Sequence, residues 1–129
     1  MDKQFSRSVA RDYVTADYAN RDQGYDWITV QVKQVSIDTI AVTIRSRADK
    51  KRSSCSLSIS AGQENDSTYV SRNDQGEIAF IFQNQYVRIQ GTNAKTEQSL
   101  SYYCSGGATI AGTYDKLTQP LNSTQLVGL

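Results

Sequence analysis

The sequence predicts an all-β protein: a small antiparallel meander barrel of about eight strands, with a β-sandwich as the alternative. Three observations carry this prediction. Apolar and polar residues alternate in short runs, and turn-forming clusters separate the runs at intervals of about 8–12 residues. The composition, with eight Tyr and one Pro, suits sheet better than helix. Sequential hairpins favour the barrel, because closure removes exposed strand edges.

The chain of 129 residues has the size of one domain. We expect residues 1–129 to form a single barrel domain, with residues 1–12 and 116–129 peripheral or flexible. Within the first segment, the spacing of Phe5 and Val9 also allows a short helical turn.

The clearest strands of the first half are residues 25–35, 40–45 and 54–61. Apolar residues recur at every second position over residues 28–33 of the first and throughout the other two. A short turn at residues 36–39 joins the first two into a hairpin. Residues 14–20 are a weaker candidate for the first strand of the barrel.

The second half continues the same pattern with less regular strands. Residues 68–71 are a short strand, and residues 77–84 are apolar on both faces, which indicates a central strand or one covered on both sides. Residues 86–90 alternate again, and residues 91–97 are expected to form a loop. Residues 99–117 then form the closing hairpin of the barrel.

The two cysteines fall on faces that are predicted to be buried. Cys55 is in phase with Leu57 and Ile59, and Cys104 is in phase with Leu100. Two inward cysteines from distant strands meet the geometric need of a core disulfide, and an even count in a small β protein favours an oxidising compartment. Two buried free thiols in a cytosolic domain are the alternative.

Further properties bear on the compartment and the partners. Residues 1–13 lack the apolar core of a signal peptide, so the chain is either cytosolic or a mature form with an added Met, and the cysteines favour a periplasmic or secreted protein. The sequence contains no apolar run of about 18 residues, so we expect no membrane span. The formal net charge of +1 indicates no nucleic-acid partner.

The chain has no histidine, which excludes Ser–His–Asp and Cys–His catalysis and histidine-ligated zinc. Carboxylates remain, but no pair is spaced for a shared catalytic site. We therefore expect a protein that is not an enzyme, with no metal site and no cofactor.

Two acidic loops, residues 62–67 and 72–76, flank one short strand. Their carboxylates Glu64, Asp66 and Asp74 are candidate contacts to a protein partner, and ordinary solvated loops are the alternative. Neither loop matches the calcium-binding pattern of an EF-hand. The basic stretch 45–52 is interpreted as a solvated hairpin loop without the aromatic residues that stack on bases.

The closing hairpin supplies the remaining candidate contacts. Tyr103 is out of phase with Cys104, so we expect it to face outward. Ser105, Gly106 and Gly107 form a glycine-rich segment between two predicted strands, which indicates a hairpin turn rather than a phosphate-binding loop.

Residues 55–117 resemble small bacterial envelope proteins, some of which occur beside or fused to lysozyme-inhibitor modules. The matching residues are Cys55, Cys104, Gly106, Gly112 and Tyr114. These residues are mostly of structural types, so the likeness concerns fold and compartment more than activity. Members of this group often carry more than two cysteines, which is a departure of this chain from the group. Bacterial immunity proteins, which neutralise secreted toxins that degrade the cell wall, are proteins of the same physical type as the lysozyme inhibitors, and the sequence fits both.

The resemblance implies a non-enzymatic protein-binding module, an inhibitor or immunity protein against a cell-wall hydrolase such as a lysozyme or a peptidoglycan amidase. Such a protein places a rigid loop in the cleft of the enzyme. A disulfide-bonded barrel orders its loops before binding, which lowers the entropic cost of association. The alternatives are a lipocalin-like carrier of an apolar ligand or lipid, which needs a hollow interior, and an envelope structural or assembly protein.

Overall fold

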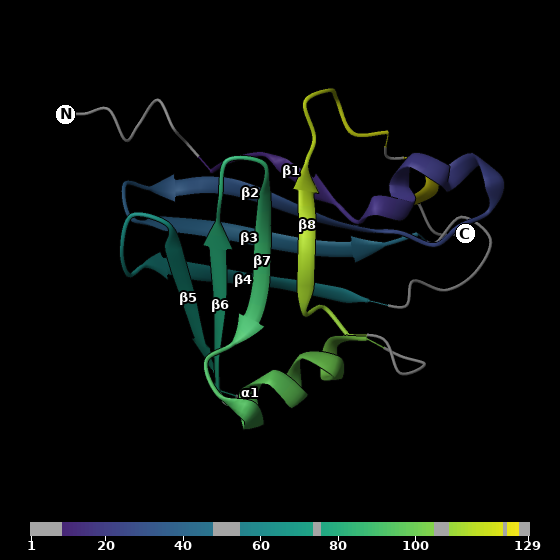
Figure 1. Cartoon of the computed structure of the whole chain (residues 1–129). Coiled ribbons are helices and arrows are strands. Elements are labelled where there is room, and N and C mark those ends of the chain that lie inside the picture. The colour runs from purple at the N-terminus through teal and green to yellow at the C-terminus, as the bar shows by residue number, and fades with distance from the viewer. Residues whose placement is uncertain (1–8, 48–54, 74–75, 105–108, 123, 127–129) are drawn as a thin grey trace.

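The computed structural model describes residues 9–47, 55–73, 76–104, 109–122 and 124–126. Eight strands form one closed antiparallel barrel in which each strand pairs with the next in sequence and β8 pairs with β1 (Figure 1). The predicted meander barrel is therefore confirmed. The strands are β1 (Asp12–Val14), β2 (Ile28–Ser36), β3 (Thr39–Ser46), β4 (Ser56–Gln63), β5 (Thr68–Asn73), β6 (Gly76–Phe82), β7 (Tyr86–Gly91) and β8 (Gly112–Lys116).

Four helical segments complete the described fold. One is an α-helix, α1 (Ala94–Ser99), and three are 3₁₀ segments: η2 (Ala16–Gln23), η3 (Leu100–Tyr103) and η4 (Thr124–Leu126). In Figure 1, β2 to β4 run across the view and β5 to β8 cross them steeply, with α1 beyond the lower end of the crossing strands. Two layers of strands therefore enclose one core.

Alternating apolar residues of every long strand point into the barrel. Phe80 and Ile44 are fully buried and Ile78 is 1% exposed, so bulky side chains occupy the middle of the barrel. The same alternation that predicts the strands places these side chains, because successive residues of a strand face opposite sides. The main core contains Val30, Val32, Ile40, Val42, Ile44, Ile78, Phe80, Phe82, Val87, Ile89, Leu100 and Ile110, among others.

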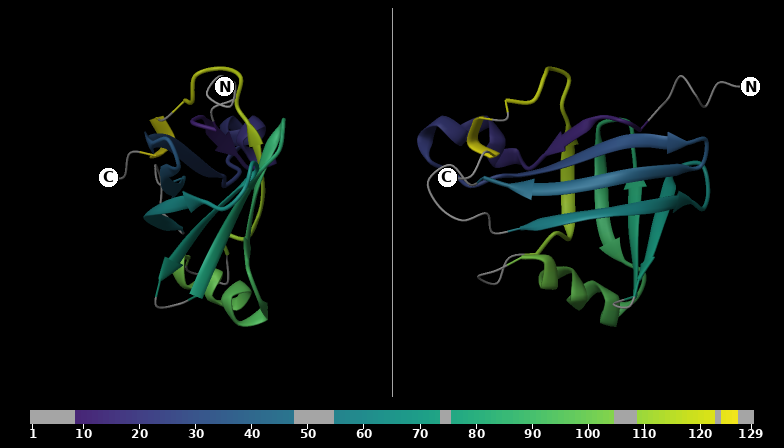
Figure 2. Two further views of the ribbon diagram at one scale, coloured as in Figure 1. Left: turned by 90° about the vertical axis from the view of Figure 1, so that its left-hand side faces the viewer. Right: turned by 180° about the vertical axis from the view of Figure 1, so that it is seen from behind.

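A second, smaller apolar cluster closes one end of the barrel. Trp27, 1% exposed, packs edge-on against Tyr18 at 4.8 Å between ring centroids. Its Nε1 donates to Oε1 of Gln125 at 2.7 Å, and Leu126 is buried beside it. Figure 2 shows η2 and η4 together at this end. The C-terminal segment is thereby tied to the connection between β1 and β2.

The predicted strand over residues 14–20 is wrong beyond Val14, where β1 ends. The chain continues as η2, and Gly24 closes it in the left-handed conformation with φ of +94°. Its N–H donates to the carbonyl of Arg21 at 3.2 Å. The physical reason is the burial of Tyr18 in the second cluster. In η2 Tyr18 packs on Trp27, whereas an extended strand would carry Tyr18 away from Trp27.

The predicted closing hairpin is also wrong in its first half. Residues 91–97 do not form a plain loop, and no strand precedes Cys104; α1 and η3 occupy these positions. Asn93 caps α1, because its side chain accepts the N–H of Thr96 at 2.9 Å. Leu100 is fully buried at the end of this helix, which shows that the apparent strand alternation around it arose from a helical residue facing the core.

The basic stretch 45–52 is only partly solvated. Arg47 is 7% exposed, and its Nη1 donates to the carbonyl of Tyr25 at 3.1 Å. Arg45 is exposed, and residues 48–52 lie outside the described residues. The part of the stretch that is described therefore contains one arginine that holds the backbone before β2 in place.

Candidate functional site

The predicted contact residues do not come together. Glu64 and Asp66 follow β4, whereas Tyr103 precedes Cys104, which is bonded to Cys55 at the other end of β4. Eight residues of strand separate the two groups, roughly 25 Å at about 3.3 Å per residue. Asp74, Ser105, Gly106 and Gly107 lie outside the described residues.

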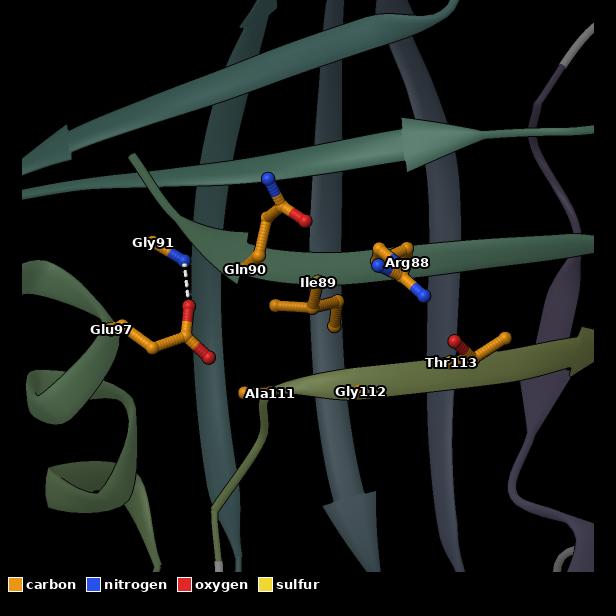
Figure 3. Close-up of a pocket in the computed structure, with 8 residues that line it drawn as sticks. All are labelled: Arg88, Ile89, Gln90, Gly91, Glu97, Ala111, Gly112 and Thr113. Carbon is orange, nitrogen blue, oxygen red and sulfur yellow. Dashed lines mark hydrogen bonds between the residues drawn. The ribbon is translucent and has the colours of Figure 1, made fainter. Parts of the chain in front are cut away.

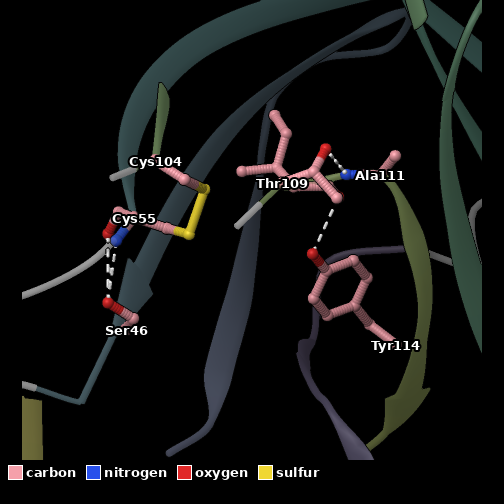
Figure 4. The surroundings of a disulfide bond; sticks show 7 residues. Ser46, Cys55, Cys104, Thr109, Ala111 and Tyr114 are labelled. Carbon is pink, nitrogen blue, oxygen red and sulfur yellow. Dashed lines mark hydrogen bonds between the residues drawn. A yellow bond between two sulfur atoms is a disulfide. The ribbon is translucent and has the colours of Figure 1, made fainter. Parts of the chain in front are cut away.

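The disulfide between Cys55 and Cys104 is confirmed, with a Cα–Cα distance of 4.0 Å (Figure 4). The hydroxyl of Ser46 accepts the N–H of Cys55 at 3.0 Å and donates to the carbonyl of Cys55 at 3.4 Å. The bond joins the start of β4 to the end of η3. It therefore fastens the helical connection between β7 and β8 to the opposite layer of the barrel.

Tyr103 is half-buried and packs against the main core, so its predicted exposure is wrong. The prediction depended on a strand at this place, in which neighbours face opposite sides. In η3 the residues follow a helical path instead, and a position next to an inward residue can also contact the core.

Glu64 belongs to a surface ion-pair cluster. Arg72 contacts Glu64 at 3.1 Å between Nη2 and Oε2, and it contacts Glu77 at 2.7 Å between Nε and Oε2. The hydrogen bonds to Glu77 and Glu64 raise the pKa of Arg72 above its usual value. The carboxylates of Glu64 and Asp66 are both exposed, and that of Glu64 is already paired with Arg72.

The loop between β4 and β5 has a fixed shape. The side-chain oxygen of Asn65 accepts the N–H of Ser67 at 3.0 Å and that of Thr68 at 3.1 Å. The N–H of Glu64 donates to the carbonyl of Thr68 at 2.8 Å. These bonds hold Asp66 outward on an ordered turn.

The hairpin between β2 and β3 carries an exposed apolar tip that the sequence analysis treats only as a turn. Ile37 is 70% exposed and Val35 is 63% exposed. Large apolar residues in turn positions are a signal in the sequence, because turns favour Gly, Pro, Asn, Asp and Ser. We call the segment from Val35 to Asp38 the apolar tip.

Hydrogen bonds order the apolar tip. Oδ1 of Asp38 accepts the hydroxyls of Ser36 and Thr39, each at 3.1 Å. Nε2 of Gln34 donates to the carbonyl of Ser36 at 2.6 Å. The N–H of Gln63 donates to the carbonyl of Asp38 at 2.8 Å, which joins the tip to the end of β4 and so to the loop that carries Asp66.

A pocket of about 430 Å³ lies where β7 and β8 stop pairing, after the Ile89–Gly112 pair (Figure 3). Its polar side chains are Arg88, Gln90, Glu97 and Thr113. Oε1 of Glu97 accepts the N–H of Gly91 at 2.7 Å, a donor that the ladder with β8 no longer uses. The pocket is open and polar, and its described groups can hydrogen-bond a partner without forming a nucleophile–base pair.

The described residues contain no group of three metal-ligating side chains, and none of their helices is long and apolar enough to cross a membrane. No family model, no curated protein and no solved structure matches the chain. The apolar tip is the most distinctive feature of the described surface.

Proposed function

We propose that this protein is a non-enzymatic protein-binding module of the periplasm or the extracellular space. Its partner class is a cell-wall hydrolase such as a lysozyme or a peptidoglycan amidase, which it inhibits as an inhibitor or immunity protein. The observation that carries the proposal is the apolar tip, where Ile37 and Val35 are exposed on an ordered hairpin.

The tip has the properties of a binding anchor. Transfer of a branched aliphatic side chain from water into an apolar site contributes about 1.5–3 kcal/mol when it goes from fully exposed to fully buried. Ile37 and Val35 retain more than half of that exposure in the barrel, so each can contribute roughly 1–2 kcal/mol on binding. The hydrogen bonds of Asp38 hold the anchor in one shape beforehand, which lowers the entropic cost of association.

The surroundings of the tip supply a polar rim. Asp66 presents an exposed carboxylate from the neighbouring loop, and the bond between Gln63 and Asp38 keeps this loop and the tip together. An apolar centre with a charged rim is the usual composition of a protein–protein interface. A cleft lined by basic and apolar side chains suits both parts.

The disulfide supports the proposed compartment, because such bonds persist in oxidising environments. The packed interior supports a surface function over a carrier of an apolar ligand, because Phe80, Ile44 and Ile78 take up the space in which such a ligand would lie. The described features do not single out a structural or assembly role.

The proposal is tested by incubating the pure protein with a panel of lysozymes and peptidoglycan amidases. We expect inhibition and co-elution with at least one enzyme, and a loss of at least tenfold in affinity for the I37D variant. The Y25A variant is the matched control, since it removes an exposed large side chain, 50% exposed, before the other end of β2. An absence of binding across the panel, or equal binding by I37D, would overturn the proposal.

A further inference from the structure

One edge of β4 is open over most of its length. On one side the strand pairs with β3 along its whole register, from Ser56 opposite Arg45 to Gly62 opposite Thr39. On the other side it pairs with β5 only at Gly62 and Gln63. An isolated antiparallel bridge between Cys55 and Cys104 stands directly before Ser56, and among the described residues no strand pairs with this second side of residues 57–61.

The direction of the backbone groups identifies the donors and acceptors on this edge. The N–H of Gln63 donates toward β3, to Asp38, and the N–H of Glu64 donates toward β5, to Thr68. Successive residues of an antiparallel strand direct their N–H and C=O groups to opposite sides. The N–H and C=O groups of Ser56, Ser58 and Ser60 therefore point to the open edge.

The residues of β4 itself carry none of the charges, prolines or bulges that usually protect an edge strand. No charged residue and no proline occurs between Ser56 and Gly62, and the register with β3 runs without a bulge along this stretch. The three serines are exposed and small, while Leu57 and Ile59, facing the core, stay half-buried. An uncharged, regular and open edge is a template for another strand.

We propose that this edge takes up an extended segment of the protein partner as an added strand. The segment forms backbone hydrogen bonds to Ser56, Ser58 and Ser60, and its inward residues are apolar because they meet the side of Leu57 and Ile59. This inference rests on the proposed function and names its binding mode. The open stretch ends at the Gly62–Val70 pair, where β5 begins to pair with β4, whereas the apolar tip is bonded to the opposite, β3 side of β4.

The position of α1 favours a single strand over a second copy of this barrel. In the views of Figures 1 and 2, α1 lies beyond the open edge of β4. A second barrel would continue the sheet through its own β4 and β3 toward α1, whereas an added segment extends the sheet by one strand spacing of about 4.8 Å.

Amide hydrogen exchange of the free protein is the first part of the test. The amides of Ser56, Ser58 and Ser60 should exchange at least tenfold faster than those of Leu57 and Ile59, which bond to β3. Addition of the peptide Lys-Thr-Val-Thr-Val-Thr-Lys at millimolar concentration should slow the three serine amides at least threefold. Uniform exchange along β4, or no slowing by the peptide, would overturn the proposal.

The S58P variant is the second part, with S58A as its matched control. Proline removes the N–H that faces the open edge and leaves the bonds to β3, a position in which strands tolerate it. We expect S58P to abolish the peptide effect and S58A to retain it. If S58P does not fold, S58K replaces it, because an added charge disfavours strand addition; retained peptide protection in the folded variant would contradict the proposal.

The outcomes separate this inference from the proposed function. A hydrolase that binds while the serine amides still exchange rapidly in the complex would overturn the edge and leave the protein-binding function standing. If the peptide protects the serine amides but no hydrolase binds, strand addition at β4 would be supported and the hydrolase would be rejected as the partner. A dimer seen by light scattering and abolished in S58P would show that a second copy occupies the edge, against our proposal.

Discussion

Removal of the Cys55–Cys104 disulfide is expected to lower the free energy of unfolding by roughly 4 kcal/mol. The two cysteines are 49 residues apart in sequence. In the chain-entropy model, the cross-link restricts the unfolded chain by about 4 kcal/mol for a loop of this length. The loop contains β4 to β7 and α1, so the bond constrains half of the barrel at once.

The assay is urea unfolding of the wild type and of the C55A/C104A double variant, followed by the fluorescence of Trp27, the only tryptophan, which is 1% exposed in the folded protein. With a urea dependence of about 1.5 kcal/mol per molar, the midpoint should fall by roughly 2.5 M. A phosphine reductant should lower the wild type by a similar amount and leave the double variant unchanged. A loss below about 1 kcal/mol, or two free thiols in unfolded and unreduced protein, would refute the reasoning.

Two further predictions concern burial and close packing. Burial raises the pKa of Tyr13 to about 12, although Arg11 lowers it in part. Because Tyr13 of the unfolded chain ionises first, its contribution to stability is present below pH 10 and falls by up to ~3 kcal/mol as the pH rises to 12. Burial also raises the pKa of Tyr114, so Y13F should reduce but not abolish the loss in urea midpoints between pH 8 and pH 12; an unchanged slope would contradict it. At Gly91, an added Cβ would meet the backbone of Thr96 and Glu97, so G91A should cost about 1–3 kcal/mol by displacing α1. The control G62A has open space around its Cβ and should melt within a few degrees of the wild type; equal melting of both variants would argue against the tight contact.

The barrel was predictable because its evidence lies in local patterns. The strands β3 and β4 alternate over about eight residues and β2 alternates from Ile28 to Lys33, so the faces of these stretches follow from the pleat. The inward direction of Cys55 followed from the same parity, since Cys55 shares the face of Leu57 and Ile59. The parity assigned to Cys104 rested on a strand where the structure has η3. Hairpins between consecutive strands then leave closure as the simplest way to remove edges.

The helical connection was missed because its local signals were weaker than the strand pattern around it. The cap at Asn93 and the helix formers after it are visible in the sequence, but the alternation near Leu100 suggested a strand. Which pattern prevails depends on packing against β6 and β7, and the approach of α1 to Gly91 becomes evident only in three dimensions.

By itself, the sequence determined the class of fold, the order of most strands and the strand faces that are buried, because each depends on the spacing of residues along one chain. The bond between Cys55 and Cys104 was decided by the tertiary structure as well, because Cys104 follows η3 and not a strand. Only the tertiary structure decided which surfaces remain for function. The ion pair of Glu64, the burial of Arg47, the partial burial of Tyr103, the ordered apolar tip and the open edge of β4 all depend on neighbours that are distant in sequence or on a strand that stops pairing. Neither a contact between residues that are distant in sequence nor the end of a strand pairing leaves a periodic signal in the sequence.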